Sequence, residues 1–88
     1  MAKTRFTQAQ KFVRRQARDC GNLAVLHFQA ALGWHREAND RAELETKAGI
    51  DHIWSAMATS YAHDRTDDAV QCARRAWRYA QESIEVQR

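Results

Sequence analysis

The sequence contains no proline, only three glycines and no long apolar run. Proline is common in turns and poorly tolerated inside helices, so its absence favours helix along nearly the whole chain, as do abundant Ala, Gln, Glu and Arg. β-branched residues rarely cluster, which argues against strands. No segment is apolar enough to span a membrane, and the basic N-terminus lacks the apolar run of a secretory signal. These absences predict an all-α, cytoplasmic protein.

Large apolar residues are also scarce, with three Phe, three Trp, four Leu, three Ile and four Val among 88 residues. Alanine, the commonest residue, lets helices approach closely but buries little area. A single domain of this size, covering residues 1–88, is marginally stable with so small a core. The imbalance indicates that a second copy, as in a homodimer, or another protein completes the core.

Apolar residues at helical spacing predict three helices, and Thr7 and Gln10 have the spacing of a capping box that begins the first of them. The second helix has an apolar stripe that includes Trp54, and the stripe of the third includes Trp77. The predicted helices cover residues 8–38, 41–62 and 67–86. Since short turns between long helices produce antiparallel neighbours, the expected fold is a three-helix antiparallel bundle with a long first helix.

The boundaries between these helices rest on local turn signals. Asn39-Asp40 and residues 63–66 provide the two turns, and Thr66 is the expected N-cap of the third helix. Glycines at positions 21 and 49 leave alternatives open. A break at Gly21 or at Gly49 gives four or five helices instead of three.

Two groups of basic residues are candidate binding sites. The first lies on one face of the first helix, opposite the apolar stripe, and consists of Lys11, Arg14, Arg15 and Arg18. It suits phosphates or an acidic protein surface, although most charge stripes are simply solvated. The second patch is Arg74, Arg75 and Arg78 on the third helix, and pairing with acidic residues of the second helix is its favoured interpretation.

The middle of the first helix carries more apolar residues than one buried face needs. Val25, Leu26 and Leu32 lie off the main apolar stripe, so apolar side chains cover almost the whole circumference of residues 23–32. Such a helix is buried on all sides. Either it is central in the bundle or part of it contacts another protein.

No residue pattern predicts catalysis, a cofactor or a metal site. The four histidines and the cysteines Cys20 and Cys72 show none of the usual ligand spacings, and the two cysteines are expected to be reduced thiols. Adjacent Asp67 and Asp68 fit the first turn of a helix. A small helical bundle also has little room for an active-site pocket.

The sequence therefore predicts a small, non-catalytic helical module that binds another protein with an acidic surface and acts as a regulator, adaptor or inhibitor. Small helical proteins of this kind are often phage or mobile-element inhibitors of a host factor, which is a guess from frequency rather than from any residue. The alternative is a nucleic-acid-binding protein that uses the basic face of the first helix.

Overall fold

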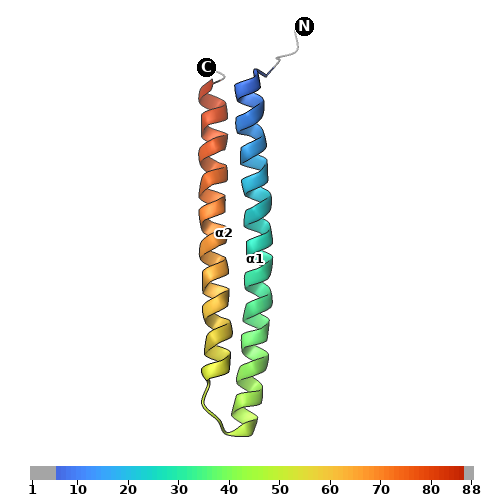
Figure 1. Cartoon of the computed structure of the whole chain (residues 1–88), viewed down its shortest axis with the longest axis vertical. Coiled ribbons are helices and arrows are strands. Elements are labelled where there is room, and N and C mark those ends of the chain that lie inside the picture. Colours follow the sequence, from blue (N-terminus) through green and yellow to red (C-terminus); the bar gives the residue numbers. More distant parts are fainter. Residues whose placement is uncertain (1–5, 87–88) are drawn as a thin grey trace.

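Two long antiparallel helices, rather than three, make up the described part of the chain (Figure 1). The computed structural model describes residues 6–86, and side chains for residues 6–84. Helix α1 covers Gln8–Ala48 and α2 covers Ile53–Val86. The hairpin measures 70 × 18 × 14 Å, with a radius of gyration of 19.9 Å. A compact domain of this length has a radius of gyration of about 12 Å. The all-α prediction is confirmed, and the three-helix bundle is wrong.

The turn predicted at Asn39-Asp40 does not exist, because α1 continues through it. Ala38 lies in the interface with α2, and so does Glu45 seven residues later. An unbroken helix keeps both residues on the same face. Packing against α2 therefore outweighs two residues that favour turns only weakly.

The turn predicted at residues 63–66 is also absent, and α2 runs through it. Thr66 is not an N-cap, since its hydroxyl donates a hydrogen bond to the carbonyl of Ala62 one turn earlier, at 2.9 Å. Ala62 and Ala69 are both fully buried against α1. Because one of these alanines precedes the supposed turn and the other follows it, a continuous helix is needed to bury both on the same face.

The N-terminus of α1 is confirmed in detail. The Gln10 amide donates to the Thr7 hydroxyl at 3.1 Å, and the Thr7 amide donates to the Gln10 side chain at 2.7 Å. This reciprocal pair is the predicted capping box. The alternative break at Gly21 is wrong, because α1 passes through it.

The alternative break at Gly49 is confirmed, and it is the single reversal of the described chain. Gly49 has a φ of 67°, in the left-handed region that glycine adopts without strain. Its amide donates to the Thr46 carbonyl at 3.2 Å, and the Ile50 amide donates to the Glu45 carbonyl at 3.1 Å. These bonds satisfy the last carbonyls of α1.

Replacing Gly49 by Ala should therefore destabilise the hairpin, even though open space surrounds the position of an added Cβ. The cost is conformational, at about 1 kcal/mol, and we expect the melting temperature to fall by about 5 °C. Thermal unfolding followed by circular dichroism measures it. Gly33→Ala, in the middle of α1, is the matched control and should instead stabilise, because alanine is the better helix former there.

The helices meet along a seam of small or polar side chains spaced seven residues apart. On α1 and α2 these are Gln10, Ala17, Ala24, Ala31, Ala38, Glu45, Ser55, Ala62, Ala69, Ala76 and Ser83. All are buried except Ala17 and Ala76, which are half-buried. The Ser55 amide donates to Glu45 at 2.9 Å, which sets the register. Steps of seven residues then place Ala62 opposite Ala38, and Ala69 opposite Ala31.

Because the seam uses small residues, the large apolar side chains remain outside it. Trp54 and Trp77, expected in the core, are 45% and 68% exposed. The accessible surface of the chain is 7004 Å². A compact protein of this mass exposes about 5300 Å². The elongated shape and the exposed apolar side chains indicate an oligomer or a partner protein.

Candidate protein-interaction surface

Two flanks border the seam, one on each side. The seven-residue period assigns each residue to one side of the seam or the other, and two ring contacts between the helices show which sides of α1 and α2 lie together. On one side the His35 and His63 rings lie 6.2 Å apart. On the other the Trp34 and Tyr61 rings lie 4.8 Å apart. A histidine pair therefore marks one flank, and a Trp–Tyr pair marks the other.

The first side is the basic flank. It comprises Lys11, Arg14, Arg18, Val25, Phe28, Leu32 and His35 of α1, with His63, Val70, Ala73, Trp77, Ala80 and Ile84 of α2. The charged side chains among these residues, Lys11, Arg14 and Arg18, are all basic and lie near the open end of the hairpin. The middle of the flank is apolar. The flank is thus cationic at one end and apolar along its length.

The second side is the mixed flank. It comprises Phe12, Asp19, Leu23, Leu26, Glu37, Asp40 and Leu44 of α1, with Trp54, Met57, Tyr61, Asp64, Asp68, Arg75 and Glu82 of α2. Apolar residues alternate here with charges of both signs. Near the loop, the Arg41 guanidinium lies 4.6 Å from the centre of the Trp54 ring and donates to the Trp54 carbonyl at 3.2 Å. Trp54 was missed as a surface candidate because it falls in the apolar stripe of a predicted helix.

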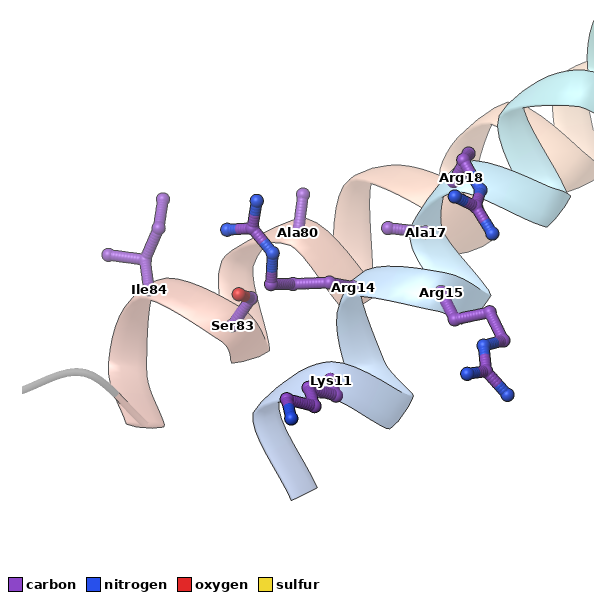
Figure 2. A pocket seen from close by; sticks show the side chains of 8 residues that line it. All are labelled: Lys11, Arg14, Arg15, Ala17, Arg18, Ala80, Ser83 and Ile84. Atoms are coloured by element: carbon purple, nitrogen blue, oxygen red, sulfur yellow. The ribbon is translucent and has the colours of Figure 1, made fainter. Parts of the chain in front are cut away.

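A terminal groove of about 650 Å³ lies on the basic flank, at the open end of the hairpin (Figure 2). Its lining is Lys11, Arg14, Arg15, Ala17 and Arg18 of α1 with Ala80, Ser83 and Ile84 of α2. Figure 2 shows Arg14 extending toward the α2 side chains, whereas Arg15 points away from α2. The Arg14 guanidinium also lies 4.1 Å from the centre of the Phe6 ring. All four residues of the predicted basic face thus border one groove.

An apolar groove of about 610 Å³ lies further along the same flank. It is lined by Phe28 of α1 and by Val70, Ala73, Arg74, Trp77, Arg78 and Gln81 of α2. Phe28 is 44% exposed. The groove thus has an apolar floor with two arginines at its edge.

The second predicted basic patch is divided by the structure. Arg74 and Arg78 line the apolar groove, whereas Arg75 lies toward the mixed flank. The ion pairs found among residues 6–84 do not include any of these three arginines. The interpretation that they pair with acidic residues of a neighbouring helix therefore has no support in the described part of the chain.

The three predicted apolar contact residues also fall on different sides. Val25 and Leu32 lie on the basic flank, and Leu26 lies on the mixed flank. They are 54%, 57% and 59% exposed, so the second helix covers none of them. The excess of apolar residues in α1 is therefore not buried in the seam. It adds exposed apolar surface to both flanks.

Glu45 holds the two helices together at the loop and is almost completely buried. Its carboxylate accepts hydrogen bonds from the Ser55 amide at 2.9 Å and the Trp54 amide at 3.2 Å, in the first turn of α2. Burial alone raises the pKa of Glu45. The hydrogen bonds from Ser55 and Trp54, helped by the charge of His52, outweigh burial and hold that pKa below its ordinary value of 4.5.

The remaining candidate groups show no assembled site in the described chain. Cys20 is half-buried and Cys72 is buried, and both are free thiols. Across residues 6–86, no three His, Cys, Asp or Glu side chains come together as metal ligands. Neither helix has a stretch long and apolar enough to cross a membrane. Comparison of the chain with protein-family models, curated proteins and solved structures finds no match.

Proposed function

We propose that this protein is a non-catalytic binding module that regulates, links or inhibits another protein by packing against it. The observation that carries this proposal is the exposure of large apolar side chains along both flanks. Trp77, Leu26 and Leu32 are each more than half exposed, beside a seam made mostly of small residues. Burial of apolar surface stabilises by about 25 cal/mol per Å², so a partner that covers one flank gains most of its affinity there.

The test is a pull-down from a lysate of the source organism with tagged protein, after nuclease treatment and a high-salt wash. We expect a stoichiometric protein that mass spectrometry can name. Val25→Glu and Leu26→Glu are tested separately, because the two residues lie on opposite flanks. At least one should reduce recovery of the partner by about 100-fold, since a charge within an apolar contact costs several kcal/mol.

Gln29→Glu is the matched control, because Gln29 is exposed and is not among the residues that line either groove or make up either flank. It should leave recovery unchanged. Circular dichroism must show equal helix content in all variants. Recovery that is insensitive to substitutions on both flanks would contradict the proposal.

A second candidate function is nucleic-acid binding, favoured by the four basic residues around the terminal groove. This function ranks second because binding to phosphates does not account for the apolar groove next to the terminal groove. With up to four phosphates neutralised, affinity for a DNA duplex should fall with salt at a log–log slope of about −3.5. Each of Lys11→Ala and Arg18→Ala should reduce that slope by about one. Binding that is insensitive to salt would exclude this function.

A further inference from the structure

We propose that the basic flank binds an amphipathic helix of another protein, and that this helix carries acidic residues at one end of its apolar stripe. The inference rests on the proposed function and deepens it, since it names the side of the hairpin and the chemistry of the partner. Two neighbouring grooves on one flank carry the argument. One is apolar and the other is lined by cations.

The shape of the flank suits a helix. The apolar groove is lined mainly by α2, and Phe28 is its contribution from α1, so the groove lies beside the line along which the two helices meet. A third helix laid there completes a three-helix arrangement, in which side chains at i, i+3, i+4 and i+7 enter the groove. Lys11 lies 17 positions before Phe28, or about 26 Å along α1. A helix of about 18 residues therefore reaches from the apolar groove to the terminal groove.

The charges specify which end of the partner is acidic. Lys11, Arg14 and Arg18 lie at the open end of the basic flank, and no acidic residue of the described chain lines either of its two grooves. A partner helix that places Glu or Asp there pairs with these cations as its apolar residues enter the neighbouring groove. Opposite charge at an interface of this kind raises the association rate and disfavours other partners.

The same charges argue against a second copy on this flank. A two-fold axis places identical surfaces against each other. In a parallel arrangement the basic ends meet and repel. In an antiparallel arrangement Arg14 and its neighbours meet the His35 and His63 end of the other copy, where the residues assigned to the basic flank are histidines and apolar side chains. Self-association through this flank thus offers the cations fewer acidic partners than an acidic helix does.

The experiment selects ligands for the full-length protein from a displayed library of helical peptides 18 residues long, with a fixed apolar stripe and randomised flanking positions. We expect the enriched peptides to carry Glu or Asp toward one end of the stripe. Trp77→Glu should weaken their binding at least 100-fold, and Arg14→Glu at least 10-fold. Gln29→Glu and Arg36→Glu, at exposed positions of α1 that line neither groove, should change it less than twofold.

A charge exchange tests the contact itself. Replacing the acidic residue of an enriched peptide by Arg should weaken binding to the wild type and restore binding to the Arg14→Glu variant. Three results would overturn the inference: no enriched peptide, enriched peptides without acidic residues, or binding sensitive to Met57→Glu but not to Trp77→Glu. Binding of the wild type, but not of Trp77→Glu, to phosphatidylglycerol vesicles without any enriched peptide would overturn it in favour of a lipid surface.

Failure of this inference and failure of the proposed function are distinguishable. A partner protein recovered from lysate by the Trp77→Glu variant but lost with Met57→Glu would place the interface on the mixed flank. That result overturns the inference and retains the binding module. If only Trp77→Glu and Arg14→Glu abolish recovery of the partner protein, the result supports both the inference and the proposed function.

Discussion

The Ala62→Leu variant should unfold at a temperature about 10 °C below the wild type, because Leu does not fit in the seam between the helices. Ala62 is fully buried and faces Ala38 across the seam. The larger side chain forces the helices apart or into strained rotamers, at a cost of about 2 kcal/mol. Thermal unfolding at a fixed protein concentration measures the effect.

Ala56→Leu is the matched control for this substitution. Ala56 lies on the same helix but is exposed, so the same change should shift the melting temperature by less than about 2 °C. Equal stability of the Ala62→Leu variant and the wild type would mean that the helices do not approach closely at this position. That outcome would contradict the register inferred from the contact between Glu45 and Ser55.

Removal of the Glu45 carboxylate should produce the second large loss of stability. Glu45→Ala leaves the amides of Trp54 and Ser55 without the acceptor that caps α2, and it cuts the polar contact that joins the helices at the loop. We expect the melting temperature at pH 7 to fall by about 10 °C. Glu43→Ala is the control, because Glu43 forms an exposed ion pair with Lys47 and should have little effect.

The stability contributed by Glu45 should also depend on pH in a defined direction. Its pKa is lower in the folded chain than the ordinary value of 4.5, so its stabilisation is fully present above about pH 4.5. It is lost as the pH falls through the lower, folded pKa. The melting temperature of the wild type should therefore drop more steeply below pH 4.5 than that of Glu45→Gln. Parallel curves for the two proteins would contradict this role.

The sequence predicts the helical class and both outer limits of the helices, because these depend on local signals. The Thr7 capping box fixes the beginning at Gln8, and the expected end at residue 86 coincides with the end of α2. The two predicted turns between the helices are wrong because their residues fit a helix as well as a turn. Asn39 and Asp40 are exposed positions of α1, and the Thr66 hydroxyl bonds to the carbonyl one turn earlier in α2. The choice between helix and turn depends on contacts 20 or more residues away, which local signals do not contain.

One signal in the sequence does predict the hairpin. Alanine recurs at positions 24, 31 and 38, and again at positions 62, 69 and 76. A seven-residue period of small residues is typical of two helices in close contact, and from Ala62 to Ala69 it crosses the supposed turn at residues 63–66. A prediction based on hydrophobicity gives more weight to large apolar residues such as Trp77 than to alanine, and therefore assigns the large residues to the core. In this protein alanine forms most of the seam, whereas Trp54 and Trp77 lie exposed on the flanks.

The candidate site is only partly predictable for the same reason. The basic face of α1 and the apolar excess around Leu26 are visible in the sequence, and both lie on exposed surface. The division of these residues between two flanks is not visible in the sequence, because it depends on where α2 lies. Val25 and Leu26 are neighbours in sequence but lie on opposite flanks, and only the register of the two helices shows which basic residues lie beside the apolar groove.

The most direct test is the distance between spin labels at Arg15→Cys and Ser60→Cys, measured by double electron–electron resonance in a Cys20→Ala, Cys72→Ala background. Dilution with unlabelled protein removes distances between molecules. In the hairpin Ser60 lies level with Asp40, which is 25 residues along α1 from Arg15, so we expect about 40 Å. A compact three-helix bundle brings these positions to about 15 Å, because its second helix returns along the first. That shorter distance would mean that a third helix covers the flanks, and it would contradict both the fold and the proposed interface.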